Sequence, residues 1–333
     1  MGAGRPAVLA EAAGHARMRP MTRIVFMGTP DFAVPSLIAV IEHYSVVGVV
    51  TQPDGTSKRG RALVPTPVKV VAEAAGVPVI QPRRLREPEA MAQLTAWSPD
   101  LIVVAAFGQI LRPAVLDWPA HGCVNVHASL LPRHRGAAPI AAAILAGDAE
   151  TGVTIMRMEV GLDTGPALRR SAPVAITAAH TTETLTVELA QVGAQALLAM
   201  LPDYLAGRLT PEAQDEAHAT YAAQLKKEAG RLDFTHPADE LARRVRAMTP
   251  WPGAYALWPN SGGDDRVLKI TQAEAVNWPA AEPGLVAATE AGLVVGCAGG
   301  ALRLIEVQPP GKRPMPAADF ARGARGFVGV KLA

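Results

Sequence analysis

Hydrophobic and polar residues alternate most clearly over residues 123–127, Cys-Val-Asn-Val-His. A period of two is typical of a β-strand, so Asn125 and His127 should point to one face of a sheet and the two valines to the other. Two residues of strand rise separate the two polar side chains by roughly 6.6 Å, so both can act on one small group. A structural histidine, buried in the core with its hydrogen bonds satisfied, would give the same pattern. The alternation alone does not decide between a structural and a reactive histidine.

Apolar runs followed by helical spacing recur over the first two thirds of the chain. They predict strands over residues 24–27, 46–50, 77–80, 100–106 and 152–158, and helices over 35–41, 68–75, 87–97, 137–145 and 181–205. Thr66 followed by Pro67 is a typical helix start. Strands and helices that alternate at this spacing predict an α/β fold, a Rossmann-like, doubly wound and mostly parallel sheet with helices on both faces.

The pattern changes beyond residue 209. A polar linker over 210–224 precedes an arginine-rich helix over 238–248, and short strand-like runs follow at 253–258, 267–270, 293–297 and 302–307. Short strands broken by Gly, Pro and Asn predict a small, OB-like β-barrel. We therefore expect a sheet domain over 21–209, a linker over 210–224 and a barrel domain over 225–333. Residues 1–20 are expected to be a disordered leader or the product of an over-early start.

Composition narrows the class of protein. The chain has 333 residues, 49% of them apolar and 19% charged, with a formal net charge of +2. The longest apolar run, 101–107, is far short of the roughly 20 residues that a membrane span needs. The small net charge argues against bulk coating of nucleic acid but leaves room for a local basic patch. Cys123 and Cys297 lie far apart without a CxxC motif, which favours a reducing compartment, the cytoplasm, and predicts no metal site.

A third candidate residue for chemistry, Asp163, lies in a Gly-Leu-Asp-Thr-Gly turn after a predicted strand. If it reaches His127, the site combines a carboxylate, an imidazole and an amide. The carboxylate would raise the pKa of the imidazole and orient it, and the amide of Asn125 would donate to an oxyanion. The GxSxG elbow of serine hydrolases is absent. Cys123 shares a strand face with His127, so a cysteine nucleophile stays open.

Several motifs together resemble the methionyl-tRNA formyltransferase family. They are Val25–Ala33, Thr51–Asp54, Asn125–His127 followed by Ser129–Pro132, Arg135-Gly136, Gly161–Gly165 and Pro250–Pro252. The resemblance extends from Met21 to the C-terminus. The Asn, His and Asp set alone is shared with other formyltransferases that use 10-formyltetrahydrofolate, so it indicates the reaction class better than the substrate.

The resemblance implies transfer of the formyl group of 10-formyltetrahydrofolate to the α-amino group of methionine on initiator tRNA, a step of translation initiation. Asn125 and His127 would stabilise the tetrahedral oxyanion. Asp163 would hold His127 and help to take the proton from the attacking amine. Residues 107–111 would form a pterin wall. The residues expected to line the folate pocket are Ser129, Leu130, Leu131 and Pro132.

The resemblance also gives a role to the polar loop at residues 51–61. Its cations Lys58, Arg59 and Arg61 would enter the acceptor end of the tRNA, and the C-terminal barrel would hold the tRNA body. The sequence Gly-Thr-Ser-Lys at 55–58 stands where Arg-Pro-Ala-Gly is common in the family, so one cation has moved and a stiffening proline is absent. A solvated turn is the alternative interpretation of this loop. We expect the protein to be a monomer.

Other classes of function compete with this one. A sugar-amine N-formyltransferase or a formyltetrahydrofolate hydrolase would share Asn125, His127 and Asp163. The basic loop and the arginine-rich helix before Pro250 favour tRNA, because a small sugar would not need them. A nicotinamide dehydrogenase is disfavoured because the GxGxxG motif is absent. A tRNA-binding module without catalysis is disfavoured by three catalytic residue types at matching positions.

Overall fold

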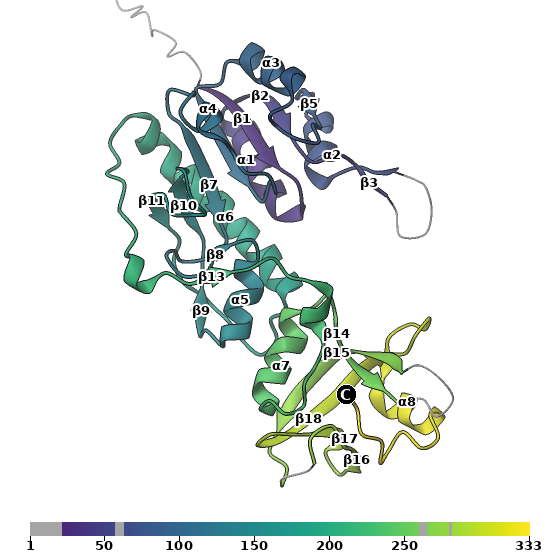
Figure 1. Ribbon diagram of the computed structural model, residues 1–333. Helices are drawn as coiled ribbons and strands as arrows, with labels where there is room; N and C mark the ends of the chain where they lie inside the picture. Colours follow the sequence, from purple (N-terminus) through teal and green to yellow (C-terminus); the bar gives the residue numbers. More distant parts are fainter. Residues whose placement is uncertain (1–21, 57–62, 260–264, 280–281) are drawn as a thin grey trace, which may run out of the picture.

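The computed structural model describes residues 22–56, 63–259, 265–279 and 282–333, and its larger sheet has seven strands (Figure 1). The spatial order is β11-β10-β7-β6-β1-β2-β5. The strands are β1 (Arg23–Gly28), β2 (Ser45–Val50), β5 (Val79–Ile80), β6 (Leu101–Ala105), β7 (Cys123–His127), β10 (Thr154–Arg157) and β11 (Ala167–Arg170). The five strands from β7 to β5 are parallel, which confirms the predicted mostly parallel sheet.

The remaining two strands run antiparallel and make the sheet mixed. β10 pairs with β7 so that Thr154 lies opposite His127, and β11 then pairs with β10. The sequence predicted the strand at 152–158 but not its direction, because an apolar run carries no information about the direction of its neighbour. This pairing places the start of β10 beside the end of β7, next to His127.

Helices cover both faces of the sheet, as predicted. They are α1 (Val34–His43), α2 (Pro67–Ala74), α3 (Pro88–Trp97), α4 (Pro113–Leu116), α5 (Pro139–Ala146) and α6 (Thr182–Leu205), with a 3-10 turn η1 at Asp31–Ala33. Alternate residues of each strand enter two separate cores: Phe26 and Val124 pack with α1, α5 and α6, whereas Met27 and Cys123 pack with α3 and α4. This division follows from the two-residue period of the strand.

Two helices illustrate how the sequence sets their bounds and burial. The Oγ1 of Thr66 accepts a hydrogen bond from the backbone N–H of Lys69 at 3.2 Å, so α2 begins where the Thr-Pro signal predicts. The longest helix, α6, has 24 residues and is apolar enough to cross a membrane by length and composition. Half of its apolar window is buried, and Leu189 and Leu197 are fully enclosed against the sheet. It is therefore a core helix of this domain.

The smaller sheet is antiparallel, with the order β14-β15-β18-β17-β16 and with β19 beside β18. Its strands are β14 (Ala254–Trp258), β15 (Arg266–Val276), β16 (Val286–Thr289), β17 (Gly292–Cys297), β18 (Gly300–Gln308) and β19 (Met315–Pro316). Helix α7 (Ala238–Ala247) packs on β15 and β18, and α8 (Ala317–Gly323) packs near β18. The edge-to-face rings of Trp258, Phe320 and Phe327 close this core. Strand β15 extends beyond the predicted 267–270, and β16 and α8 were not predicted.

Short strands tie the segment between the two sheets to the larger one. β13 (Tyr221–Ala222) pairs in parallel with β8 (Arg135–Gly136), and Glu212 forms a bridge with Ala167. The same segment contains two 3-10 turns, η2 (Glu216–His218) and η3 (Lys227–Gly230). The other short strands are β9 (Glu150–Thr151) and β12 (Val174–Ala175), which pair with one another, and β3 (Gly55–Thr56) and β4 (Leu63–Val64), which form a hairpin. The predicted linker is therefore anchored along part of its length.

Some predictions concern residues that the structure does not describe. The predicted leader, 1–20, lies outside the described residues, and so do Lys58, Arg59 and Arg61. The hairpin of β3 and β4 on either side of residues 57–62 is described, and its Leu63 and Val64 side chains are exposed.

Candidate active site

Strand β7 separates its side chains between two faces in the way that the alternation predicts. Val124 and Val126 are enclosed in the core beneath α5 and α6. Asn125 is half-buried, and the side chain of His127 is 5% exposed. The strand therefore holds an amide and an imidazole on the same face, with their backbone fixed by hydrogen-bonded neighbours on both sides.

The ring of His127 is held in one tautomer. Its Nε2 lies 2.9 Å from the carbonyl oxygen of His134, which can only accept, so Nε2 carries the hydrogen. Its Nδ1 lies 3.5 Å from Oδ2 of Asp163. Burial lowers the pKa of His127, and the opposing charge of Asp163 does not outweigh it. Asp163 acts to raise this pKa, as predicted, but burial has the larger effect and the net pKa is lowered, so the ring is uncharged near neutral pH.

Asp163 is positioned by the loop that joins β10 to β11. Its backbone has a φ of +54°, and its Oδ2 accepts a hydrogen bond from the backbone N–H of Gly136 at 2.8 Å. Its Oδ1 lies 3.5 Å from Nδ2 of Asn125. The structure thus brings together the three residues that the sequence singled out, with the carboxylate between the amide and the imidazole.

The side chain of His134 and its partner Asp148 support the carbonyl that orients His127. His134 has a φ of +59°, its Nε2 lies 2.7 Å from Oδ2 of Asp148, and its backbone N–H donates to Oγ1 of Thr220. Burial acts to raise the pKa of Asp148, but hydrogen bonds from Arg133 and His134 leave it below its ordinary value. The carboxylate therefore stays charged and holds the turn that presents the His134 carbonyl.

The turn after β7 is part of this scaffold. The hydroxyl of the fully buried Ser129 donates to the carbonyl of Arg133 at 2.6 Å. The backbone N–H of Leu131 donates to Thr154, and its carbonyl accepts from Arg170. The described contacts of Ser129 and Leu131 are structural. The folate-lining role of Ser129, Leu130, Leu131 and Pro132 stays a prediction.

Some large apolar side chains near the candidate residues in the sequence are exposed. Val160 and Leu162, in the loop of Asp163, are 77% and 57% exposed, and Ile110 is 90% exposed. Phe107 and Met158 belong to or pack against the core that also contains Cys123. Exposed apolar side chains of this kind are common in ligand sites.

Cys123 does not have the properties of a nucleophile. It is fully buried, and its thiol donates to the carbonyl of Val115 at 3.5 Å. Burial, assisted by the charge of Asp117, raises its pKa to about 12. The reactive thiolate is therefore scarce at neutral pH, and the structure disfavours the cysteine alternative.

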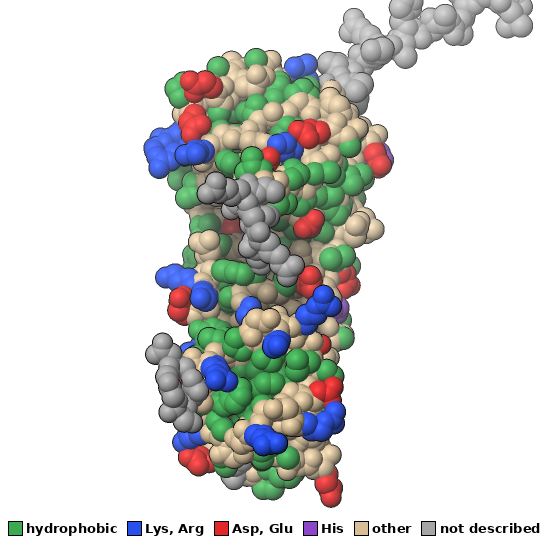
Figure 2. All heavy atoms as spheres, turned by 90° about the vertical axis from the view of Figure 1, so that its right-hand side faces the viewer, with side chains coloured by type: hydrophobic (Ala, Val, Ile, Leu, Met, Phe, Trp, Pro, Cys, Tyr) green, Lys and Arg blue, Asp and Glu red, His purple; other side chains and the backbone are tan. Residues whose placement is uncertain are grey.

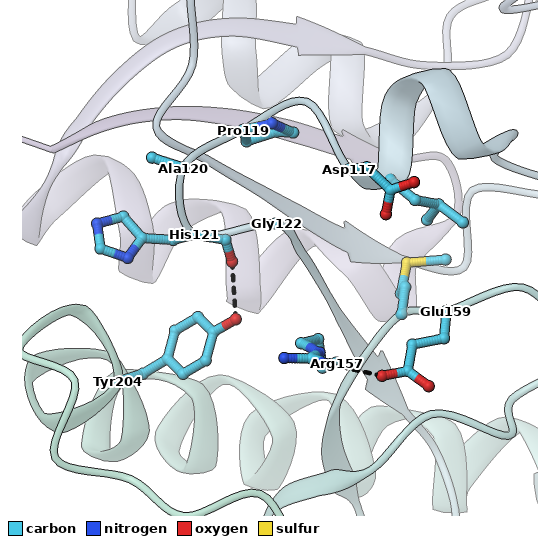
Figure 3. A pocket seen from close by; sticks show the side chains of 10 residues that line it. Asp117, Pro119, Ala120, His121, Gly122, Arg157, Glu159 and Tyr204 are labelled. Carbon is cyan, nitrogen blue, oxygen red and sulfur yellow. Dashed lines mark hydrogen bonds and ion pairs between the residues drawn. The ribbon is translucent and has the colours of Figure 1, made fainter.

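A separate cavity of about 530 Å³ lies at the opposite end of β7 (Figure 3). It is lined by residues 116, 117 and 119–122, by Arg157, Met158 and Glu159, and by Tyr204 of α6. Tyr204 donates to the carbonyl of His121 at 2.7 Å, and Arg157 pairs with Glu159. This cavity contains none of the three candidate residues. Within the described ranges, no group of three or more His, Cys, Asp or Glu side chains is placed to hold a metal ion.

Two family models match this chain. The model "Formyl transferase" matches residues 22–201, and "Formyl transferase, C-terminal domain" matches residues 224–325. Solved structures share the fold: a sugar 3N-formyl transferase, WlaRD, with a TM-score of 0.61 and 17% identity, covers 88% of this chain and 99% of its own. HypX from Aquifex aeolicus in complex with tetrahydrofolic acid has a TM-score of 0.60 and 16% identity, over 93% of this chain and 48% of its own. The fold and the site thus define a formyltransferase.

Sequence relatives narrow the class further. The methionyl-tRNA formyltransferase of Citrifermentans bemidjiense is 46% identical over 93% of this chain and 97% of its own length. That of Myxococcus xanthus is 49% identical over 90% and 95%, and that of Methylococcus capsulatus is 49% identical over 93% and 99%. The chain belongs to the methionyl-tRNA formyltransferase family.

Sequence reasoning missed several groups that hold the site. The carbonyl of His134 and the amide of Gly136 act through the backbone, so residue type does not predict them. Gln214 donates to the carbonyls of Asp163 and Gly165 from a segment that looked like a polar linker. The Arg135-Gly136 motif was the one available signal, because both of its residues contact this arrangement.

Proposed function

We propose that the protein transfers the formyl group of 10-formyltetrahydrofolate to the α-amino group of methionine carried by initiator tRNA. One observation carries the proposal: in a chain of this family, Asp163 lies 3.5 Å from both Asn125 and His127, which share one face of β7. An amide, an uncharged imidazole and a carboxylate are the groups that acyl transfer to an amine needs: an oxyanion donor and a base.

Each of the three residues has a chemical task in this proposal. The α-amino group has a pKa of about 7.7–8.0, so near neutrality it readily loses its ammonium proton to solvent and attacks as the free amine. Nδ1 of His127, beside Asp163, takes the second proton, which the amine nitrogen loses as it bonds to the formyl carbon. The imidazolium so formed and Nδ2–H of Asn125 then stabilise the oxyanion. His127 returns the proton to the departing folate nitrogen, which restores its neutral form.

The exposed apolar side chains of the Asp163 loop fit a folate co-substrate. Val160 and Leu162 are exposed there, and a flat pteridine ring that covered them would remove their surface from water. The co-substrate supplies the activated formyl group. The turn at Ser129, Leu130, Leu131 and Pro132 would close the pocket next to His127.

We assign the binding of tRNA to the two remaining basic regions. Lys58, Arg59 and Arg61, which lie between β3 and β4 in the sequence, would contact the acceptor end. In the C-terminal half, Lys and Arg side chains gather on the face shown in Figure 2. Exposed cations of that half of the chain include Lys226, Lys269 and Arg313. We further propose that the antiparallel sheet is an OB-like barrel, that the domains span 21–209 and 225–333 with a linker at 210–224, and that the enzyme is a cytoplasmic monomer.

A substrate panel tests the proposal. The enzyme is incubated with 10-formyltetrahydrofolate and, in turn, methionyl initiator tRNA, methionyl elongator tRNA, an amino-sugar nucleotide or no acceptor. We expect rapid formylation of the initiator tRNA alone. Preferential transfer to the amino sugar would establish a sugar N-formyltransferase. Release of formate at the same rate without an acceptor would establish a hydrolase.

The basic loop requires a test of its own. Each cation that contacts phosphate should lower the slope of affinity against salt by about 0.7–0.9 when it is removed. Arg59→Ala should also lower turnover more than Lys58→Ala does, because positioning of the methionyl end contributes to the barrier. If the triple alanine variant has the same kinetics as the unaltered enzyme at two salt concentrations, the loop is only a solvated turn with no role in tRNA binding.

A further inference from the structure

The carboxylate of Asp163 is positioned by its loop, and that loop is held from outside by Gln214. Nε2 of Gln214 donates to the carbonyl oxygens of Asp163 and Gly165 at 2.8 and 2.6 Å. Its Oε1 accepts from Nε of Arg135 at 3.0 Å. The partners fix the orientation of the amide, because two carbonyls need a donor and a guanidinium needs an acceptor.

The anchor of Gln214 is a buried guanidinium whose carboxylate partner, Glu216, is exposed. The side chain of Arg135 is fully buried, and both of its terminal nitrogens donate to the carboxylate of Glu216, at 2.7 and 2.9 Å. The backbone N–H of Arg135 donates to the carbonyl of Thr220, so the guanidinium extends from the paired strands β8 and β13. A bidentate pair of this kind fixes both position and angle. Gln214 therefore links the Asp163 loop, through the buried side chain of Arg135, to the paired strands β8 and β13.

The contacts of Gln214 and Gly136 converge on the same residue. The amide of Gly136, next to Arg135, donates to the Asp163 carboxylate, while Gln214 holds the Asp163 backbone. At Gly136, where φ is +116°, a Cβ would lie 2.5 Å from the carbonyl oxygen of Ala222. The close approach of the two strands thus requires glycine, and it brings the Gly136 amide to the carboxylate.

We propose that Gln214 is a positioning residue for formyl transfer: it fixes the Asp163 loop, so that the carboxylate stays against His127 and Asn125. The inference rests on the proposed function, since it assigns a role within that same site. Without Gln214 the loop keeps its sequence and its ends on β10 and β11, but two of its carbonyls lose their donor. The carboxylate then samples positions away from Nδ1 of His127.

The test compares three variants of the full chain. Gln214→Ala removes all three hydrogen bonds. Gln214→Glu keeps the shape and the Arg135 contact but turns a carboxylate oxygen towards the two carbonyls. Glu212→Gln is the matched control, because Glu212 lies in the same segment and its side chain pairs with Arg170 rather than with the Asp163 loop.

We expect both Gln214 variants to lose turnover by about tenfold to a hundredfold, which is the cost of slight misplacement of a reacting group. The KM values for tRNA and folate should change less than about threefold on the same reasoning, and the kcat–pH profile should shift as the carboxylate moves from His127. Hydrogen exchange of the amides at 161–165 should accelerate in Gln214→Ala and stay unchanged in Glu212→Gln.

The outcomes separate this inference from the proposed function. If the unaltered enzyme does not formylate initiator tRNA, the proposed function fails, while loop exchange still reports whether Gln214 holds the loop. If the enzyme is active and both Gln214 variants match Glu212→Gln in turnover and exchange, Gln214 has no positioning role. Loss of folding in both Gln214 variants would also overturn the inference, because Gln214 would then serve stability alone.

Discussion

The two ends of strand β7 differ in how firmly their polar side chains are held, and the candidate active site lies at the better-held end. At the end of the strand, His127 is 5% exposed and Asp163 14%, and the fixed carbonyl of His134 and amide of Gly136 orient them. At its start lies the cavity of about 530 Å³, where Arg157 and Glu159 pair with one another at the surface. The three candidate residues therefore lie at the end of β7 away from this cavity.

The difference lies in the hydrogen bonds that fix each polar group before a substrate arrives. Asp163 and His127 have their partners supplied by the backbone, so little reorganisation remains to be done during a reaction. Arg157 and Glu159 at the other end are each almost half exposed, and an exposed pair contributes little and moves easily. Substitutions at the two ends should therefore have effects of very different size.

The largest effect is expected at the end that holds the triad. Asn125→Ala and His127→Ala should each lower turnover by about 10²–10³ or more, because each removes a group that acts on the developing charge. Affinity for tRNA should change little, since both residues lie on the core strand. Single-turnover rates and tRNA binding measured on the same preparations check this. Near-normal turnover in a folded Asn125→Ala enzyme would show that residues 123–127 form a core strand without a catalytic role.

A smaller effect, with a diagnostic pH dependence, is expected for Asp163→Asn. Activity should rise with pH as His127 loses its proton, below the ordinary pKa of about 6.5 because burial lowers that pKa. The charge of Asp163 opposes burial, so its removal lowers the pKa further. The acidic limb of kcat should move to lower pH, and the plateau should fall by about 10² as the base weakens. An unshifted limb would show that Asp163 does not act on His127.

The opposite face of the same strand should affect stability rather than chemistry. Val126 is 2% exposed and belongs to the core beneath α6. Val126→Ala removes two buried methyl groups and should cost about 2 kcal/mol in the free energy of unfolding. Turnover of the folded fraction should fall less than twofold, because the backbone of β7 is held by both neighbouring strands. Denaturant titration and active-site titration separate the two quantities.

The smallest effect is expected at the start of β7. Tyr204→Phe removes the hydrogen bond to the carbonyl of His121 and should cost about 1 kcal/mol of stability. Turnover should stay within about twofold of the unaltered enzyme, because Tyr204 lines the cavity away from the triad. A loss as large as that of Asn125→Ala would mean that the cavity takes part in the reaction, and the contrast between the two ends would disappear.

The sequence was informative where the chemistry is local. The alternation at 123–127 predicted both the strand and its faces, and Thr66-Pro67 predicted a helix start. The sequence alone did not place Asp163 near His127. That expectation relied on family resemblance, because the sequence of a turn does not reveal which strand lies beside it. Gln214 could not be found in this way. Its partners are backbone carbonyls about fifty residues earlier in the chain, and a polar residue in an Ala-rich stretch with scattered charges predicts only exposure.

The pairing of β8 with β13 has a consequence for how the enzyme is made. Every strand of the larger sheet, up to Arg170, leaves the ribosome before residues 214–222 do. Domains fold largely in the order of synthesis, so the sheet can form while the segment that holds Arg135 and the Asp163 loop is still inside the ribosome. The Asp163 carboxylate is therefore synthesised before the residues that hold its loop in place. We expect a nascent chain to gain the fold early and competence for formyl transfer only after Ala222 has emerged and docked.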